Sequence, residues 1–265
     1  MQKMLSLLRS CVDDYQMIEA GDRIAVGISG GKDSLTLLIL LAELKKFYPK
    51  PFELEAFTVD MGQGGMDFSP VAALCADLGV PYHRVETQIG PVIFEHRKER
   101  NPCSLCAKMR RGALSAALTA AGIRKIALGH HRDDAVETFL MSLLYEGRIS
   151  CFEPVTYLDR SGVTQIRPML YLPEQMVAHF AEKRALPVVY NTCPADHQTT
   201  RQEVKELIRS LHGSYPELKT RVFGAMQRYP LHNWDKRRPP VQARSRREAA
   251  QENDAGKRGD GDIPS

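Results

Sequence analysis

A glycine-containing turn at residues 29–34 has the residue types of a phosphate-binding site. It consists of Ser29, Gly30, Gly31, Lys32, Asp33 and Ser34. An apolar stretch at residues 24–28 precedes it and helix-forming residues at 35–47 follow, which predicts strand, turn and helix. Adjacent glycines at such a place let backbone amides surround an anion, and the helix dipole adds attraction. The two serines add hydroxyl groups, and Lys32 adds a positive charge.

The spacing of this turn excludes two familiar phosphate-binding motifs. Val26 stands where a Walker A loop has its first glycine, and Asp33 stands where that loop has Ser or Thr. The dinucleotide fingerprint separates its glycines, whereas these two are adjacent. A purely structural alternative is an ordinary turn capped by Asp33 or Ser34.

A second polar group, Gly-His-His-Arg-Asp-Asp-Ala-Val-Glu-Thr, occupies residues 129–138. It follows an expected strand and opens an expected helix, and open α/β sheets bind ligands at the carboxyl ends of their strands. Asp133 and Asp134 can hold Mg²⁺ beside ATP or move a proton from the substrate, and either can instead cap the helix. Asp60 ends an earlier strand, so it is also expected at the carboxyl edge of the sheet, where the ligand would bind.

Three of the six cysteines have a spacing that suggests chemistry. Cys103 and Cys106 form a C-x-x-C pair, and Cys193 lies far downstream. A zinc site would need a fourth ligand such as Cys151 or a histidine. Three thiolates with an open position suit an iron–sulfur cluster, and a redox pair is a third alternative. The cysteines expected to serve only in packing are Cys11, Cys75 and Cys151.

The elements that must position these groups alternate along the chain. Strands are expected at residues 24–28, 53–60, 82–86, 125–128 and 163–166, with helices at 35–47, 69–78, 108–121 and 133–145. This alternation predicts an α/β fold with a doubly wound parallel sheet. Further helices at residues 173–184, 199–211 and 216–227 predict a helical C-terminal extension. We expect an N-terminal helix within residues 1–22, a main domain at 23–234 and a disordered basic and polar tail at 235–265.

Composition limits the class of protein. The chain has 265 residues, of which 43% are hydrophobic and 26% charged, as in ordinary globular proteins. No apolar run reaches the roughly 20 residues of a membrane helix, so we expect no membrane partner. Reduced cysteines and the absence of a signal-peptide pattern favour the cytoplasm. The net charge of +4 is too small to indicate a nucleic-acid partner by itself.

Taken in order, these motifs resemble the tRNA 2-thiocytidine synthetase (TtcA-like) family of the PP-loop ATP-pyrophosphatase superfamily. The resemblance rests on residues 29–34, Cys103 and Cys106 followed by Arg110-Arg111-Gly112, residues 129–134, Glu137-Thr138, residues 166–169 and Cys193. It implies an adenine nucleotide alpha hydrolase-like fold. It also implies an ATP-dependent tRNA sulfurtransferase that adenylates the C2 oxygen of a cytidine, at position 32 of the anticodon loop, and replaces that oxygen with sulfur.

The resemblance also assigns cofactors and residues. It implies ATP, Mg²⁺ and a [4Fe–4S] cluster on Cys103, Cys106 and Cys193. Expected catalytic residues are Lys32, Asp33, Arg110, Asp133 and Asp134. The nucleotide site is expected to comprise residues 29–34 with Asp60, Gly129 and His130.

A tRNA substrate requires a basic surface, and basic residues gather around the C-x-x-C pair. The predicted RNA-binding residues are Arg97, Lys98, Arg100, Arg111, Arg148 and Arg167. The alternative for this cluster is a solvated charged face. Other expected partners are a sulfur donor, such as a cysteine desulfurase or free sulfide, and a second copy of the chain in a homodimer.

Two other functions remain open at this point. One is a PP-loop enzyme that adenylates another nucleobase or a small molecule. The other is a zinc-bound RNA-binding protein without catalysis, against which the intact loop with Ser29 and Asp33 argues.

Overall fold

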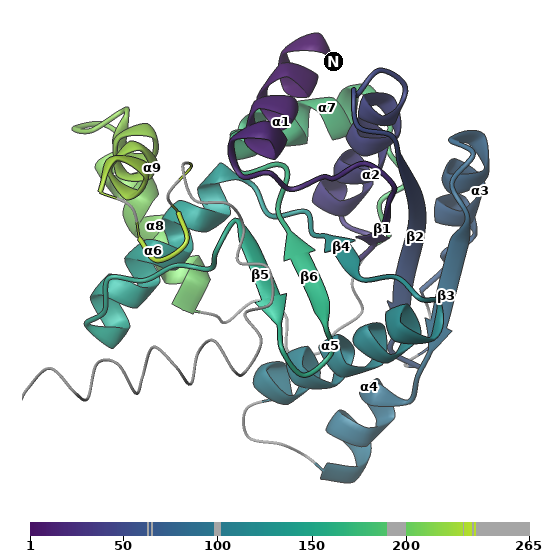
Figure 1. The fold of residues 1–265 in the computed structure, drawn as a ribbon. Coiled ribbons are helices and arrows are strands. Elements are labelled where there is room, and N and C mark those ends of the chain that lie inside the picture. Colours follow the sequence, from purple (N-terminus) through teal and green to yellow (C-terminus); the bar gives the residue numbers. More distant parts are fainter. Residues whose placement is uncertain are drawn as a thin grey trace, which may run out of the picture.

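A six-stranded sheet with helices on both sides forms the centre of the molecule (Figure 1). The computed structural model describes residues 1–62, 64, 66–97, 102–189, 200–229, 231–234 and 236. The strands are β1 (Asp22–Gly27), β2 (Phe52–Asp60), β3 (Tyr82–Glu86), β4 (Lys125–Ala127), β5 (Val155–Leu158) and β6 (Val163–Ile166). The helices are α1 (Gln2–Asp14), α2 (Lys32–Lys45), α3 (Ser69–Asp77), α4 (Ile89–Pro91), the π-helix η1 (Val92–Arg97), α5 (Pro102–Ala120), α6 (Arg132–Glu146), α7 (Glu174–Lys183), α8 (Thr200–Leu211) and α9 (Leu218–Arg228).

The strand order is β3-β2-β1-β4-β6-β5, and all neighbouring pairs except β5 and β6 are parallel. From β1 the chain moves outward to β2 and β3, then returns to place β4 on the other side of β1. The predicted doubly wound parallel sheet is therefore confirmed. The antiparallel strand β5 at its edge was not predicted.

Alternating side chains of β1 divide the core between the two faces of the sheet. Ile24 and Val26 belong to a large cluster with α1, α2, α3 and α7, whereas Ala25 belongs to a small one. The small cluster consists of Ala25, Phe57, Leu118, Ile123, Ile126 and Val163. This division follows from the two-residue period of a strand, which sends successive side chains to opposite faces.

Helix α2 lies at the centre of the large cluster and is buried on almost every side. All residues from 34 to 42 are buried, and the helix packs against α1, α7, β1 and β2. Helices that are apolar all round occur in such positions. The amino end of α2 is therefore held by packing on several sides.

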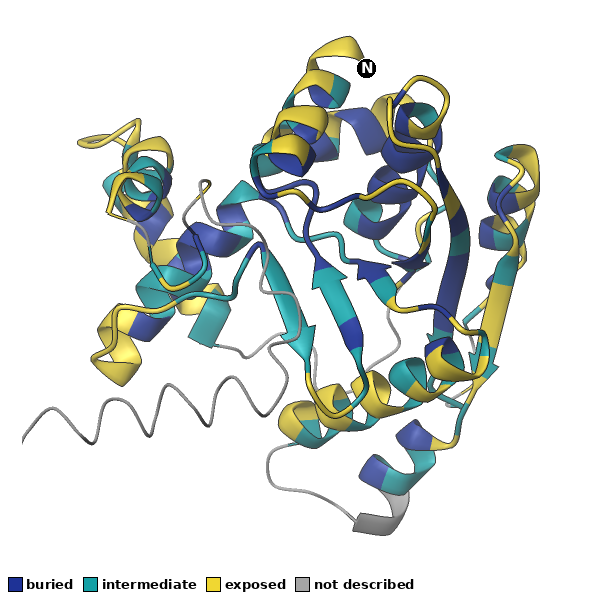
Figure 2. Cartoon of the chain, in the orientation of Figure 1, coloured by how far each residue is buried: buried dark blue, intermediate teal, exposed yellow. Residues whose placement is uncertain are grey.

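Helix α5 covers the opposite face with much less burial. Only Leu118 is buried along its described length, and its outer side is exposed (Figure 2). The helix begins at Pro102, six residues before the predicted start, so that Cys103 and Cys106 lie in its first turns. Proline is favourable at the first position of a helix. The prediction missed this start because the C-x-x-C pair was interpreted as a metal-binding motif and not as part of the helix.

Helices α6, α8 and α9 form a group beside the sheet (Figure 1). Trp234 ties the chain after α9 to this group: its indole N–H donates to the carbonyl of Phe152 at 3.1 Å, and its ring packs edge-on against Tyr15 and Phe223. Of the predicted tail, only Lys236 lies among the described residues, and its ammonium group is 2.9 Å from Asp14.

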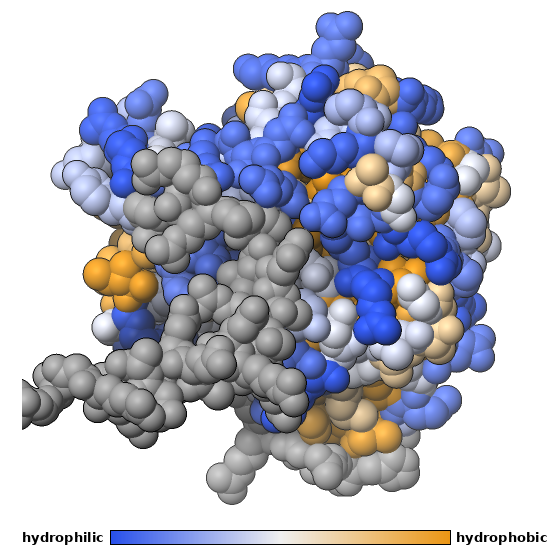
Figure 3. Space-filling view, viewed as in Figure 1, coloured by the Kyte–Doolittle hydropathy of each residue, from blue (hydrophilic) through white to orange (hydrophobic). Residues whose placement is uncertain are grey.

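The viewed face is largely hydrophilic, with small scattered apolar patches (Figure 3). No helix in the described ranges combines the length and apolar character needed to cross a membrane.

We expect Trp234→Ala to lower the free energy of unfolding by about 3–5 kcal/mol, because it removes a fully buried indole ring. Urea unfolding followed by circular dichroism measures the change. Tyr229→Ala is the matched control, since Tyr229 is 81% exposed and its loss should change stability by less than about 0.5 kcal/mol. Equal effects of the two substitutions would contradict this packing.

Candidate nucleotide and sulfur-transfer site

The turn at residues 29–34 and the motif at residues 129–138 meet at the carboxyl ends of β1 and β4. These strands are neighbours, and the chain leaves them in different directions. Such a switch point is where open α/β sheets bind ligands. Gly129 shows how close the two segments are, because a Cβ atom there would lie 3.0 Å from the carbonyl carbon of Asp33. Glycine is needed for this approach of one backbone to another.

Hydrogen bonds within the turn fix its shape. The amide and hydroxyl of Ser29 both donate to Ser34 Oγ at 3.2 Å, and Ser34 donates to the Gly31 carbonyl at 2.9 Å. Gly30 has a φ of +86°, a conformation that glycine adopts without strain. Gly31 caps α2 without a side-chain acceptor, so the first amides of this helix remain for an anion.

Two carboxylates hold Lys32 beside this turn. Its ammonium group lies 2.9 Å from Asp33 Oδ1 and 3.5 Å from Glu174 Oε1, at the start of α7. Burial alone would lower the pKa of Lys32, but the two acids raise it above its usual value. Lys32 is therefore a permanent positive charge at the place where the sequence predicted a phosphate ligand.

His131 joins the turn to the start of α6. The His131 side chain is 2% exposed. Its Nδ1 atom accepts a hydrogen bond from the Asp134 backbone amide at 3.3 Å. In return, Asp134 Oδ2 accepts a hydrogen bond from the His131 backbone amide at 2.9 Å. This reciprocal capping fixes the helix start. The other ring nitrogen lies 3.8 Å from Asp33 Oδ1. Asp134 thus caps the helix and keeps its second oxygen at the site, where it accepts from Arg201 at 3.0 Å.

Asp133 is buried and both of its oxygens are used inside the protein. Oδ1 accepts from Lys219 of α9 at 2.5 Å, and Oδ2 accepts from the Glu174 amide at 2.9 Å. Burial would raise the pKa of Asp133, but Lys219 and the amide hold it below its usual value. Asp133 therefore connects α6 to α7 and α9. Its predicted catalytic role stays a prediction.

Glu137, one turn further along α6, is a buried carboxylate without a hydrogen-bond partner. It is 1% exposed, and its nearest cation is Lys205 of α8, with the ammonium group 3.8 Å away. Burial raises the pKa of Glu137 to about 7, against the opposing effect of Lys205.

An aromatic and cationic layer lies at the ends of β4 and β6. The ring of His130 packs against Phe152 at 4.9 Å, and the Arg167 guanidinium also lies 4.9 Å from the Phe152 ring. Burial lowers the pKa of His130 to about 4, so its ring is neutral at physiological pH. Arg167 is 6% exposed and donates to Glu153 O, Thr156 Oγ1 and Gln165 Oε1. Its contacts in this structure are within the protein, and its predicted RNA contact stays a prediction.

Asp60 ends β2 as predicted, and its carboxylate is occupied locally. Oδ1 accepts from the Gly62 amide at 2.9 Å, and Oδ2 pairs with the guanidinium of Arg84. The backbone carbonyl of Asp60 accepts from Thr87 at 2.6 Å. These contacts shape the end of the strand, and a contact of Asp60 with the nucleotide stays a prediction.

Cys103 and Cys106 lie three residues apart in the first turns of α5, which places them on one side of the helix. Cys103 is exposed and Cys106 is half-buried. Two thiols that share one side of a helix can bind the same metal centre. Cys193 lies outside the described residues. Cys11 and Cys75 are buried, which confirms their predicted packing role, and Cys151 is half-buried with its thiol 3.4 Å from the Ala135 carbonyl oxygen.

The predicted RNA-binding residues are distributed over two regions. Arg111 is exposed on α5, beside the exposed Arg110 that was predicted to be catalytic, and Arg148 is exposed at the end of α6. The backbone of Arg97 closes η1. The Arg97 side chain, Lys98 and Arg100 lie outside the described part.

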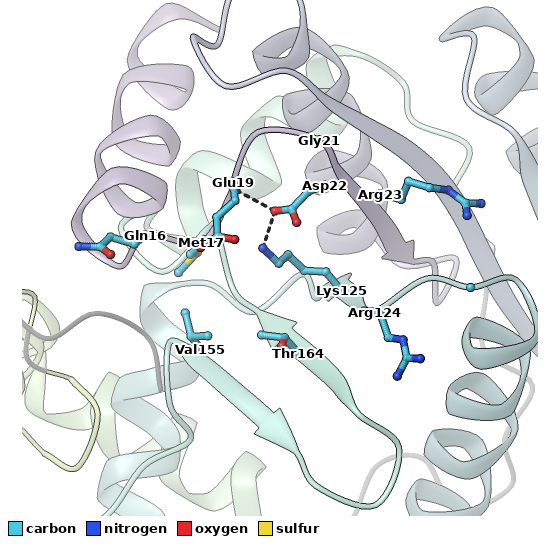
Figure 4. Close-up of a pocket in the computed structure, with 11 residues that line it drawn as sticks. Gln16, Met17, Glu19, Gly21, Asp22, Arg23, Arg124, Lys125, Val155 and Thr164 are labelled. Atoms are coloured by element: carbon cyan, nitrogen blue, oxygen red, sulfur yellow. Dashed lines mark hydrogen bonds and ion pairs between the residues drawn. The ribbon is translucent and has the colours of Figure 1, made fainter. Parts of the chain in front are cut away.

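A cavity of about 390 Å³ opens at the opposite edge of the sheet (Figure 4). It lies at the amino ends of β1 and β4, where Asp22 accepts from the Glu19 amide and pairs with Lys125. Asp22 and Lys125 neutralise each other, Arg23 pairs with Glu55 outside the cavity, and the cavity is remote in topology from the motifs. It is therefore not a candidate for the nucleotide.

Comparison with known proteins identifies the family. The profile of the PP-loop domain matches residues 3–211. A tRNA-cytidine(32) 2-sulfurtransferase from Alkalilimnicola ehrlichii is 39% identical, over 89% of this chain and 76% of its own. Proteins of the same name from Pelobacter propionicus and Geobacter metallireducens are each 38% identical, covering 84% and 85% of this chain and 85% and 89% of their own lengths. This chain belongs to the tRNA-cytidine(32) 2-sulfurtransferase family of PP-loop proteins.

The fold agrees with this membership. The U34-tRNA thiolase NcsA from Methanococcus maripaludis, solved with its [4Fe–4S] cluster, superimposes with a TM-score of 0.71. The two sequences are 25% identical, over 86% of this chain and 78% of NcsA. The range matched by the PP-loop domain includes residues 29–34, the turn predicted to be the PP-loop.

The PP-loop site contains charged residues that sequence reasoning did not assign. Helices α8 and α9 supply Arg201, Lys205 and Lys219, and α7 supplies Glu174. Each pairs with a residue of one of the two motifs. The sequence contains only a weak indication of these residues, because charged side chains at this spacing on an amphipathic helix are equally typical of a surface exposed to solvent.

We expect Gly129→Ala to reduce ATP turnover by about ten- to hundredfold, because the added Cβ atom displaces the PP-loop backbone at Asp33. Pyrophosphate release measures the effect. Gly213→Ala is the control, since no atom lies within 4 Å of the new Cβ atom. Unchanged turnover in the Gly129 variant would show that this contact does not position the loop.

We expect the stability of Glu137→Gln relative to the wild type to rise with pH. Unfolded Glu137 ionises near its ordinary pKa of 4.5, while the folded carboxyl keeps its proton to a pKa of about 7. Wild-type stability is therefore lost as pH rises through this interval, by an amount on the order of 3 kcal/mol. Urea unfolding of both proteins between pH 5 and pH 8 tests this, and parallel stability curves would contradict it.

Proposed function

We propose that this protein is an ATP-dependent tRNA-cytidine sulfurtransferase that thiolates cytidine 32 of the anticodon loop. The observation that supports it most is the direct contact between the PP-loop and the motif at residues 129–138 in a member of this family. One reaction sequence accounts for the site: AMP is transferred to the C2 oxygen of cytosine, and sulfur then displaces it.

The first step uses ATP at the PP-loop. The amides at the start of α2 and the Lys32 ammonium group bind the β- and γ-phosphates, which leaves the α-phosphorus open to attack by the cytosine oxygen. This attack forms an oxygen–phosphorus bond and releases pyrophosphate. Asp33 and Asp134 supply oxygen ligands of the kind that Mg²⁺ prefers, and the metal would offset the charge of the leaving group.

The second step requires a sulfur nucleophile near the adenylated base. Cys103 and Cys106 offer soft thiolate ligands on one side of α5, and Cys193 is proposed as the third ligand of a [4Fe–4S] cluster. Such a cluster, with one iron free of protein ligands, supplies a position for sulfur. Arg110 is one turn beyond Cys106 and is proposed to orient the base or to offset charge on the departing AMP.

The tRNA contact is proposed to extend along the exposed arginines. Arg111 follows the cysteines on α5, and Arg148 lies at the end of α6. Such residues bind phosphates, while the target base turns out of the loop to reach the site. Arg97, Lys98 and Arg100 are proposed to add to this surface, whereas Arg167 is buried.

Three further assignments complete the proposal. Sulfur comes from a cysteine desulfurase or free sulfide. The working protein is a homodimer. Its place is the cytoplasm, where thiols stay reduced and can bind the cluster.

In a deletion strain complemented with Cys103→Ala or Cys193→Ala, we expect tRNA without 2-thiocytidine, because a cluster ligand is lost. Mass spectrometry of tRNA nucleosides measures the product, and iron and sulfide analysis of anaerobically prepared protein measures the cluster. Cys75→Ala is the control, because burial raises the pKa of this thiol to about 11 and keeps it from ligation.

Two results would count against the proposal. Normal 2-thiocytidine in the deletion strain would exclude the substrate. Wild-type protein without iron and sulfide would exclude the cluster.

A further inference from the structure

Two lysines from different elements approach one carboxylate beside the PP-loop. Lys32 Nζ lies 3.5 Å and Lys205 Nζ 3.9 Å from Oε1 of Glu174. Lys32 belongs to the loop, whereas Lys205 lies on α8, outside both motifs. Because both ammonium groups approach the same oxygen atom, a polyphosphate that takes the place of this carboxylate can reach both.

The contacts of Lys205 differ from those of the other site cations. Its ammonium group is 3.8 Å from Glu137 and 3.9 Å from Glu174, beyond hydrogen-bond length. By contrast, Lys219 approaches Asp133 to 2.5 Å. The Lys205 side chain is also 28% exposed, so solvent and ligands can reach it. The ammonium group of Lys219 is therefore used in a short ion pair within the protein. The ammonium group of Lys205 is attracted by two acids but has no direct hydrogen bond to either of them.

Glu137 is the buried acid that Lys205 approaches from α8. Its carboxylate is 1% exposed and neither oxygen has a hydrogen-bond partner, which is costly for a buried group. The charged groups that face it are Lys205 and Arg201 of α8, Asp134 of its own helix, and Glu174 of α7. A small apolar residue would fill this place at lower cost, so the carboxylate indicates a function in directing a cation.

We propose that Lys205 is a second polyphosphate-binding cation of the ATP site and that Glu137 is the residue that positions it. Phosphate oxygens replace the Glu174 carboxylate as the partner of both lysines when the nucleotide binds. The inference rests on the proposed use of ATP, and it extends the nucleotide site to the C-terminal helix α8.

The test compares nucleotides of different phosphate length. Calorimetry on the anaerobically prepared full chain measures binding of ATP, AMP and pyrophosphate. For Lys205→Met, we expect affinity for ATP and pyrophosphate to fall by about ten- to hundredfold. Affinity for AMP should stay unchanged, because AMP lacks the phosphates that Lys205 contacts. Lys205→Arg should keep most of the ATP affinity.

Two more variants separate positioning from general effects. Arg209→Met removes a positive charge one turn further along α8 from an exposed position and should leave all three affinities unchanged. Glu137→Gln should weaken ATP and pyrophosphate binding by about three- to tenfold, without affecting AMP. A merely structural effect of either Glu137 or Lys205 would lower all three affinities together.

The inference is overturned if Lys205→Met binds ATP and pyrophosphate like the wild type, or loses affinity for AMP equally. Unchanged ATP binding in Glu137→Gln overturns the positioning role. Nucleoside analysis keeps the proposed function separate. If Lys205 governs ATP binding but tRNA from the deletion strain keeps its normal 2-thiocytidine, the proposed function is wrong and the inference stands.

Discussion

The approach of Gly129 to the backbone of Asp33 and Ser34 is the constraint on which the site depends. A Cβ atom at Gly129 would lie 3.0 to 3.1 Å from three atoms of these residues. The contact is available because β1 and β4 are neighbours although about a hundred residues separate them in the chain. It brings the anion-binding end of α2 against the carboxylates at the start of α6. Phosphate binding and the handling of the metal or proton thus share one edge of the sheet.

Part of the charge balance at this edge comes from outside the two motifs. The acids Asp133, Asp134 and Glu137 all project from one helix, and their mutual repulsion would oppose folding. Cations from two other helices offset these acids. Lys219 of α9 pairs with Asp133, and Arg201 and Lys205 of α8 face Asp134 and Glu137 respectively. The C-terminal extension is therefore part of the site's electrostatics, and the geometry of the motifs depends on it.

The sequence predicted the parts of the fold that follow from local pattern. The strands and the helix after the PP-loop were placed within a few residues because apolar periodicity and glycine turns mark them. Strand β5 was missed because its four residues are all half-buried and lack a clear alternation. The partners of the acids were missed for a different reason. Lys205 meets Glu137 through tertiary packing of α6 and α8, and no spacing along the chain encodes that contact.

The groups proposed for the two chemical steps begin helices that cover opposite faces of the sheet, and the faces differ in packing. The PP-loop begins α2, whose residues are buried in the large cluster, so its amides have a fixed geometry for phosphates. The cysteines begin α5, which has one buried residue in its described length and contacts the small cluster. Regions with few buried contacts open at lower free energy than the core. An anticodon loop must turn a base toward the site. The sparsely packed helix carries the groups proposed to meet the tRNA, while the densely packed one carries those proposed to meet ATP.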